Sequence, residues 1–546
     1  MAQADESGNF LYYGDNLDIL RRYIKDESVD LVYLDPPFKS NQSYNVLFAE
    51  RNGRDSAAQI RAFEDTWHWD RAAARAYEDI VEAGGAVSQA MQALRSFLGQ
   101  SDMTAYLAMM APRLAELHRV LKPSGSIYLH CDPTASHYLK MLLDAVFGPE
   151  NFRNEIIWKR AQPKAHVSLR MSRAHDVILF YAKSSRAKYH QQYRPHDPDY
   201  VEKFYKFVEE GTGRRYRLDN LANPNKNRPN LTYEFPPGSG VVRVWRWTKE
   251  RMQKEWEDGR VVLPKRGEVV AYKRYLDEME GAGVTSVWDD IEHLHGSHRE
   301  SLGYPTQKPE ALLERIIKTS SEEGDRVLDP FCGCGTTVSV AQRLNRKWTG
   351  IDVTHLAVRL IRRRLHSAFG NRVSYKVIGQ PQDLSGARQL AESDPYEFQW
   401  WALSLLETGR EERKKGADRG IDGRVYFHDE AAGGKTKQII LSVKSGHVSV
   451  AQVRDLRGVL EREEAEIGVL ITLREPTRAM LKEAAGSGFY ESPGWRKKYP
   501  RIQIVTIEDL LAGKGIDYPP SRQVDTTFRK APKAGSKTSK QKDLPC

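Results

Sequence analysis

Near-continuous apolar runs recur along the N-terminal part of the chain, separated by segments with apolar residues at helical spacing. The runs Val32–Leu34, Ser126–His130 and Val327–Leu328 have the character of strands buried on both faces of a parallel sheet. Leu107–Leu121 is one of the amphipathic helices expected between such strands. This alternation predicts a doubly wound α/β fold.

The pattern starts again at Tyr396, with an apolar helix, a glycine-rich turn, two strands, a helix and a further strand. A smaller α/β domain is therefore expected after the first. Between about Ala161 and His298 the apolar periodicity fades, and aromatic residues alternate with basic ones, as in RVWRW (Arg243–Trp247). The predicted segments are a first domain at 1–378 with an insert at 161–298, a polar linker at 379–395, a second domain at 396–515, and a basic, disordered tail at 516–546.

A glycine-rich loop directly follows one predicted strand, in the stretch RVLDPFCGCGTT (Arg326–Thr337). Gly333 and Gly335 allow a tight turn and a close approach of the backbone to a ligand, and Thr336 begins a helix. The loop lacks the lysine of a phosphate cradle, and Asp329 adds negative charge instead. It suits a nucleoside-like ligand with a cationic or neutral tail, although many glycine-rich turns bind nothing.

Acidic residues follow three other predicted strands. Asp352 ends the run TGID about 20 residues after the glycine loop, where doubly wound folds place an acid that binds ribose hydroxyls. Asp15 follows LYYG and is also suited to cap the next helix. In SVDLVYLDPPF (Ser28–Phe38), Asp35 directly follows the apolar run that ends at Leu34, and two prolines then stop regular structure; a rigid turn is the simpler interpretation of that pair.

These motifs resemble those of the DNA amino-methyltransferases. DPFCGCGTT is similar to the S-adenosylmethionine loop of that family, apart from Cys334 in place of the usual serine, and PTQKPEALLERII (Pro305–Ile317) is similar to the helix before that loop. DPPF resembles the family's catalytic motif, and its place before the cofactor loop matches the permuted, beta-type arrangement. The resemblance covers roughly residues 10–370 and implies that the chain methylates DNA.

The resemblance assigns residues to two sites. The carboxylate of Asp35 and the backbone carbonyl of Pro36, fixed by Pro37, would accept both N–H hydrogens of an exocyclic amine and make its nitrogen more nucleophilic. Phe38 would stack on a base that has been flipped out of the duplex. The residues implied to bind S-adenosylmethionine are Asp15, Lys308, Asp329, Pro330, Phe331, Gly333, Gly335, Thr336 and Asp352.

The resemblance also bears on the target base. In that family, aspartate at the first position of the catalytic motif goes mostly with adenine N6 and serine mostly with cytosine N4, so Asp35 favours adenine. Cytosine N4 stays open as the alternative, because its amine would meet the same acceptors. A cytosine C5 enzyme would need a cysteine nucleophile, usually after proline, and the only Pro-Cys pair is Pro545–Cys546.

The second domain resembles the Mrr-like branch of the PD-(D/E)xK endonucleases. Asp422 and Lys444 match that family's Mg²⁺-binding acid and its lysine, and Glu397 matches its helix acid loosely. Ser442 stands where glutamate or glutamine is expected, and a hydroxyl is a poorer ligand for Mg²⁺. The resemblance implies Mg²⁺-dependent cleavage with the metal on Asp422; the alternative is a degenerate nuclease fold that binds DNA without cutting it.

Composition narrows the partners. The net charge of +10 and the basic, aromatic insert suit contact with double-stranded DNA, although an ordinary solvated insertion has a similar composition. No apolar run approaches the roughly 18 residues of a membrane span, and the N-terminus has neither signal nor transit character. Four scattered cysteines fit a protein of a reducing cytoplasm. We expect the protein to be encoded by a bacterium or a phage. A homodimer and a separate restriction subunit both remain open.

Overall fold

A computed structural model describes most of the chain, and two compact units are distinguished in it: residues 191–285, and residues 1–190 together with 286–546. The described residues are 8–37, 69, 71–160, 172–263, 270–295, 298–302, 304, 306–381, 383–393, 395–406, 410–411, 420–429 and 436–520. None of the helices in these ranges has both the length and the apolar character needed to cross a membrane.

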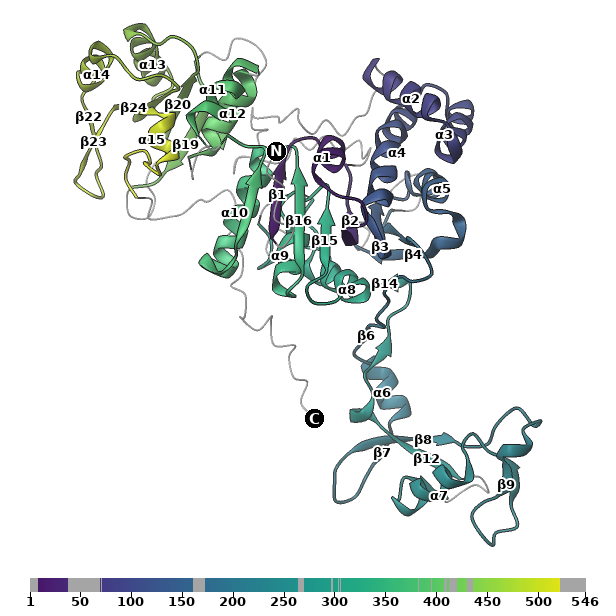
Figure 1. Ribbon diagram of the computed structural model, residues 1–546. Coiled ribbons are helices and arrows are strands. Elements are labelled where there is room, and N and C mark those ends of the chain that lie inside the picture. Colours follow the sequence, from purple (N-terminus) through teal and green to yellow (C-terminus); the bar gives the residue numbers. More distant parts are fainter. Residues whose placement is uncertain are drawn as a thin grey trace. The chain divides into compact units, whose positions relative to one another are not determined.

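The larger unit contains a nine-stranded sheet in the order β14-β4-β5-β3-β2-β15-β16-β1-β17, and Figure 1 shows its central strands side by side. Every neighbouring pair is parallel except the two that involve β5. The strands are β1 (Asn9–Tyr13), β2 (Val29–Leu34), β3 (Leu121–Cys131), β4 (Phe152–Lys159), β5 (His175–Ala182), β14 (Val287–Trp288), β15 (Arg326–Asp329), β16 (Lys347–Asp352) and β17 (Tyr375–Ile378).

Helices connect these strands, which confirms the predicted doubly wound α/β class. They are α1 (Asn16–Tyr23), α2 (Arg71–Ala83), α3 (Gly85–Leu98), α4 (Asp102–Val120), α5 (Ser136–Phe147), α8 (Glu310–Ser320), α9 (Thr336–Arg343) and α10 (His355–Phe369). All six residues of β2 are buried, as expected for a central strand of a parallel sheet. Its one acid, Asp30, is compensated by the Lys122 ammonium at 2.8 Å and the Arg326 backbone N–H at 2.9 Å.

The unit 191–285 has a small core of its own, made by Leu221, Phe235, Trp245, Met252, Val261 and Val270. Its first and last strands pair with each other through Arg194 and Ala282. Strands β5 and β14 lie within the interval 161–298 that was predicted as the insert, yet they belong to the large sheet. The elements of the unit are β6 (Tyr193–Arg194), α6 (Pro198–Phe204), β7 (Phe207–Val208), β8 (Arg215–Asn220), β9 (Thr232–Glu234), β10 (Val242–Val244), α7 (Lys249–Glu257), β11 (Val261–Val262), β12 (Ala271–Tyr275) and β13 (Ala282–Gly283).

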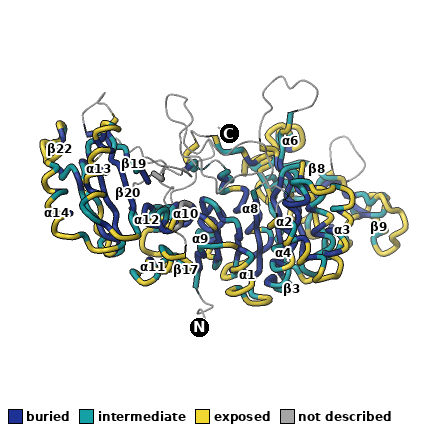
Figure 2. Tube along the Cα trace, turned by 90° about the horizontal axis from the view of Figure 1, so that it is seen from above, coloured by how far each residue is buried: buried dark blue, intermediate teal, exposed yellow. Residues whose placement is uncertain are grey.

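The C-terminal region forms a five-stranded sheet in the order β18-β19-β20-β21-β24. In Figure 2 buried residues follow β20, most of whose residues lie in the core. Residues 384–393 of the predicted linker form a helix, because Ala387 packs into the same core as Phe398. The elements are α11 (Leu384–Ser393), α12 (Pro395–Ser404), β18 (Arg410–Glu411), β19 (Gly423–Phe427), β20 (Lys437–Lys444), α13 (Val450–Arg462), β21 (Ile467–Thr472), α14 (Arg478–Ala485), β22 (Phe489–Glu491), β23 (Lys498–Pro500), β24 (Ile502–Thr506) and α15 (Ile507–Leu511).

Candidate active site

The carboxyl ends of four adjacent strands bring the predicted acids to one edge of the large sheet. In the sheet order β2, β15, β16, β1, Asp35 follows β2, Asp329 and Asp352 end β15 and β16, and Asp15 follows β1. Parallel strands place their functional residues at this edge. The strands that lead to these residues lie side by side in Figure 1, so residues far apart in the sequence come to one edge of the sheet.

The glycine loop after β15 has the conformation that its sequence predicts. Gly333 and Gly335 have φ angles of 47° and 74°, in the left-handed region. A Cβ on Gly335 would lie 2.6 Å from Cγ1 of Ile361 on α10, so no larger residue fits there. The Gly333 N–H donates to Oδ2 of Asp352 at 2.9 Å, which ties the loop to the end of β16.

Two carboxyl groups at this edge are buried without a cation in contact among the described residues. Burial raises the pKa of Asp329 to about 7 and that of Asp352 to about 6. The N–H and hydroxyl of Thr354 donate to Asp352 at 2.9 and 2.8 Å, which opposes part of that rise. Such a pair would be stabilised in its anionic form by a ligand that is cationic near Asp329 and donates hydroxyl hydrogens to Asp352.

Asp15 caps α1 and also forms an ion pair. Its Oδ1 accepts the backbone N–H of Leu17 at 2.9 Å, and its Oδ2 accepts from Arg113 at 2.7 Å. The next residue, Asn16, is buried and donates to the carbonyl oxygen of Pro330 at 2.8 Å, so α1 is fixed to the start of the glycine loop. Arg113 and Asn16 were not predicted, since only the three-dimensional pairing identifies them.

A lysine pairs with the predicted catalytic acid. Lys308, which the sequence assigned to the cofactor, donates a hydrogen bond to Oδ2 of Asp35, and both side chains are mostly buried. Within the described part of the chain this is the hydrogen bond that Asp35 accepts, so Oδ1 is left for another donor. Pro36 and Pro37 follow outside the strand, and Phe38 lies outside the described residues.

Arg364 is a further residue that the sequence did not assign to this site. Its side chain is buried on α10, where it donates to Glu310 on α8 at 2.8 Å and to the Thr336 hydroxyl at 3.1 Å. Thr336, predicted to bind the cofactor, is thus held by the arginine. The signal in the sequence was a basic residue amid the apolar spacing of Ile361 and Leu365.

The predicted second site has a different character. Both oxygens of buried Asp422 accept hydrogen bonds: Oδ1 from the Gln399 amide at 2.7 Å, and Oδ2 from the Ser442 hydroxyl at 3.2 Å and the Val443 N–H at 2.6 Å. The Nζ atom of Lys444 lies 3.8 Å from Oδ2 of Asp422. The side chain of Glu397 is outside the described residues.

These contacts do not support the predicted Mg²⁺ site. A hard cation needs oxygen acceptors that point at it, whereas Gln399 and Ser442 donate hydrogens to Asp422. In the described residues, no group of three or more His, Cys, Asp or Glu side chains could hold a metal. Ser442, which stands where glutamate or glutamine is expected, is therefore part of an internal hydrogen-bonded cluster.

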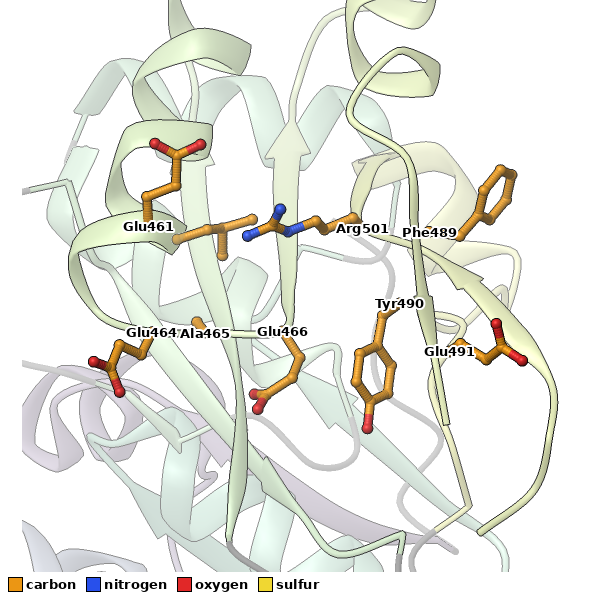
Figure 3. Close-up of a pocket in the computed structure, with 9 residues that line it drawn as sticks. Glu461, Glu464, Ala465, Glu466, Phe489, Tyr490, Glu491 and Arg501 are labelled. Atoms are coloured by element: carbon orange, nitrogen blue, oxygen red, sulfur yellow. The ribbon is translucent and has the colours of Figure 1, made fainter. Parts of the chain in front are cut away.

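A pocket of about 550 Å³ in the C-terminal region contains none of the predicted site residues. Figure 3 shows it between α13 and β22, with acids on both sides of Arg501. Its lining is Leu460, Glu461, Glu464, Ala465, Glu466, Phe489, Tyr490, Glu491 and Arg501. Because four glutamates surround one arginine, the pocket does not suit a DNA phosphate.

Several aromatic and basic residues of the predicted insert pack inside the unit 191–285. Trp245 is fully buried, and Trp247 packs against Tyr272 with the Arg251 guanidinium over its ring at 4.2 Å. The Arg214 guanidinium pairs with Asp277 at 2.8 Å. Much of the pattern that suggested base contact thus builds the small core of this unit.

Two protein families match parts of the chain. The family described as DNA methylase, with the label N6/N4, matches residues 29–363, which include Asp35, Lys308 and Asp352. The family described as NACHT-associated inactive Restriction Endonuclease 1 matches residues 396–512. That second description names an inactive family, in line with the contacts of Asp422.

Individual proteins are similar over the first region. The Mod subunit of the type III restriction-modification enzyme StyLTI from Salmonella typhimurium is 28% identical over 360 residues, 64% of this chain and 52% of that protein. The type II methyltransferase M.EcaI from Enterobacter cloacae is 25% identical over 361 residues, 65% of this chain and 69% of that protein. The chain thus spans about half the length of the first relative and about two thirds of the second.

A solved structure described as a DNA modification methylase from Thermus thermophilus, complexed with S-adenosyl-L-methionine, is 16% identical. The match covers 68% of this chain and 99% of that one, with a TM-score of 0.33.

Proposed function

Because the chain belongs to the N6/N4 DNA methylase family, we propose that it transfers a methyl group from S-adenosylmethionine to an exocyclic amine of a DNA base. The observation that carries this proposal is the arrangement at the sheet edge. Asp35 has one oxygen held by Lys308, and β2 is the immediate neighbour of β15, which leads into the glycine loop. An acceptor for an amine therefore stands beside a loop suited to a nucleoside.

The described residues fit S-adenosylmethionine. Asp352 would accept hydrogen bonds from the ribose hydroxyls, and Asp329 would face the cationic part, where both burial and the raised pKa favour a positive partner. Gly333 and Gly335 would let the backbone approach the ligand closely. When bound, the cofactor supplies a methyl group on a positively charged sulfur.

The residues after β2 would prepare the amine. Its nitrogen lone pair is delocalised into the base, so the nitrogen becomes nucleophilic when acceptors engage both of its hydrogens. Oδ1 of Asp35 and the carbonyl oxygen of Pro36 are the proposed acceptors, while Lys308 keeps Oδ2 of Asp35 in place. The proton that the amine must lose after methylation would pass to the carboxylate of Asp35.

We further propose adenine N6 as the target, supported by the aspartate of the DPPF motif; cytosine N4 is the second candidate, because the matched family carries both labels. We also propose a restriction-modification role in the cytoplasm; the role is supported by the relatives' names. A separate restriction subunit is proposed because one relative is a type III Mod subunit, with a homodimer as the alternative. The C-terminal domain is proposed to bind DNA or a partner without cleavage, as the saturated Asp422 suggests.

The test incubates the full chain with labelled S-adenosylmethionine and unmethylated DNA, with and without Mg²⁺, followed by nucleoside analysis and a gel. The expected result is N6-methyladenine in intact DNA under both conditions. Detection of N4-methylcytosine would identify cytosine N4 as the target instead of adenine N6. Fragments that form only with Mg²⁺ would contradict the proposal that the C-terminal domain does not cleave DNA. If no label reached the DNA under either condition, the proposed transfer would be wrong.

A further inference from the structure

Three buried polar side chains form a hydrogen-bonded chain beside the proposed catalytic loop. The hydroxyl of Tyr33 on β2 lies 3.0 Å from Nδ1 of His130 on β3, and Nε2 of His130 lies 3.2 Å from Oδ2 of Asp176 on β5. Each of the three residues is at most 3% exposed. The proposed transfer uses none of them, although buried polar groups of this kind are costly unless they are fully paired.

The strand register places this chain at the end of β2. Leu34 pairs with Leu129 across β2 and β3, so the next pair of positions along the two strands is Asp35 and His130. Side chains two residues apart on a strand point to the same face, which puts Tyr33 on the face from which Asp35 continues. The hydrogen bonds thus connect the carboxyl ends of β2 and β3 with the amino end of β5 where the catalytic loop begins.

The charge of Asp176 fixes the direction of its hydrogen bond with His130. Burial alone would raise the pKa of Asp176, but the hydrogen bond from His130 and the charges of His130, Lys308 and Arg160 hold it below its usual range. As a carboxylate only accepts, Nε2–H of His130 donates to it. Burial raises the pKa of Tyr33 well above its usual value, so its hydroxyl keeps its hydrogen in the contact with Nδ1 of His130.

Charged groups from the neighbouring elements support Asp176 in the ionised form. Nε of Arg160, just after β4, lies 3.4 Å from Oδ1 of Asp176. The ring of Trp158 stands edge-on to His130 at 5.7 Å. Lys308, which holds Asp35, also favours the anionic form of Asp176, so one ammonium acts on both carboxylates.

We propose that His130 is a positioning residue for methyl transfer, which with Tyr33 and Asp176 fixes the place of Asp35 through directed hydrogen bonds. This inference rests on the proposed function. Apolar packing tolerates small shifts of a strand end, whereas a chain of three hydrogen-bonded groups does not. Correct placement matters because a shift of about 1 Å at a reacting group can lower a rate by about 100-fold.

The test compares two tyrosine variants in the full chain. Tyr33→Phe removes only the hydroxyl that reaches His130. Its matched control, Tyr128→Phe, removes an equally buried hydroxyl on β3 that bonds to Ser320 at 2.7 Å. Tyr33→Phe is expected to lower kcat about tenfold while the KM for DNA and the Kd for S-adenosylmethionine change less than about twofold; Tyr128→Phe should leave kcat within about twofold of the wild type.

Asp176→Asn gives a second measurement, since the amide keeps the shape of the side chain and removes its charge. It is expected to lower kcat in the same way, again with cofactor binding retained. Equal kcat values for Tyr33→Phe and Tyr128→Phe, or parallel losses of kcat and cofactor binding in Tyr33→Phe and Asp176→Asn, would show a merely structural role and overturn the inference. An inactive wild-type protein would instead overturn the proposed function.

Discussion

Asp35 and Asp422 each have a lysine nearby, but their carboxylates differ in how many hydrogen bonds they can still accept. Asp35 shares Oδ2 with Lys308, and its Oδ1 accepts no hydrogen bond from the described residues. Asp422 is 2% exposed, and both of its oxygens accept from Gln399, Ser442 and the backbone of Val443. The first carboxylate keeps an oxygen for a further donor, whereas the second has both oxygens occupied by donors of its own fold.

The difference lies in how burial is compensated. A cation at one oxygen compensates the charge of Asp35 and leaves the other oxygen available. At Asp422, with Lys444 at 3.8 Å, neutral donors occupy both oxygens, which leaves fewer lone pairs for a metal. A matching acid and lysine in the sequence therefore do not establish an active site; the hydrogen-bonding capacity that each acid has left distinguishes the two.

The largest expected effect follows removal of the open acceptor. Asp35→Ala should lower kcat by about 1,000-fold or more, because both the orientation of the amine and the proton acceptor are lost. The Kd for S-adenosylmethionine should change little, since Asp329 and Asp352 are untouched. Labelled transfer and equilibrium binding measure the two quantities; retained transfer would refute the proposed role of Asp35.

Removal of the cation from the first pair should have a smaller effect. Lys308→Met keeps the length of the side chain but leaves Asp35 without its partner, and kcat is expected to fall about 10- to 100-fold. If Lys308 served the cofactor instead, the Kd for S-adenosylmethionine would rise in proportion. Lys308→Arg is the matched control, because it keeps the charge.

The pH dependence tests the buried acid of the glycine loop. With a folded-state pKa of about 7, Asp329 binds its proton more tightly in the folded than in the unfolded chain, so its contribution to the free energy of unfolding is present below about pH 4 and is lost as the pH rises through about 7. Asp329→Asn should reduce the fall in Tm of the cofactor-free protein between about pH 5 and pH 8.

Cofactor binding should follow the opposite trend. The affinity of the wild type for S-adenosylmethionine is expected to rise several-fold between about pH 6 and pH 8 as Asp329 ionises, and this rise should be absent in Asp329→Asn. Calorimetry over that range measures it. A pH-independent affinity in the wild type would show that Asp329 does not face the cation.

The smallest effect on activity is expected at the second aspartate. Asp422→Ala should leave methyl transfer unchanged, and Lys444→Ala likewise, because neither residue supports the first site. Asp422→Ala should still destabilise the C-terminal domain by about 1–3 kcal/mol, since buried donors of Gln399 and Ser442 lose their acceptor. Denaturant unfolding measures this loss of stability. If the wild type cleaved DNA with Mg²⁺ and either substitution abolished that cleavage, Asp422 would belong to an active site and the proposed difference from Asp35 would be wrong.

The sequence predicts what depends on local pattern. The strand before Asp35, the glycine loop and the acid at Asp352 are each recognisable within a dozen residues, because burial and backbone conformation act locally there. The Lys308–Asp35 pair joins residues 273 positions apart, and Gln399 reaches Asp422 from a different element. Such contacts depend on strand order and helix packing, which a local pattern does not encode.

In the aromatic insert, too, the local sequence did not predict the environment of the residues. The basic, aromatic composition of the insert suggested a DNA-binding surface, yet Trp245 is buried and Arg214 pairs with Asp277. Residue types alone do not separate an aromatic core from an aromatic contact surface. The difference becomes visible only once the fold shows which side of each strand is covered.

Strands β2 and β15 are adjacent in the sheet but far apart in the sequence, so β2 waits for its partner during synthesis. The N–H of Arg326 meets the carboxylate of Asp30 across 296 positions, so a ribosome working at about 5–20 residues per second needs roughly 15–60 s to supply the partner of β2. The pairing of Arg194 with Ala282 shortens the effective loop between the two strands, because the insert can close on itself first. During that interval one edge of β2 has no partner, since only β3 has been made, and chaperones protect edges of this kind.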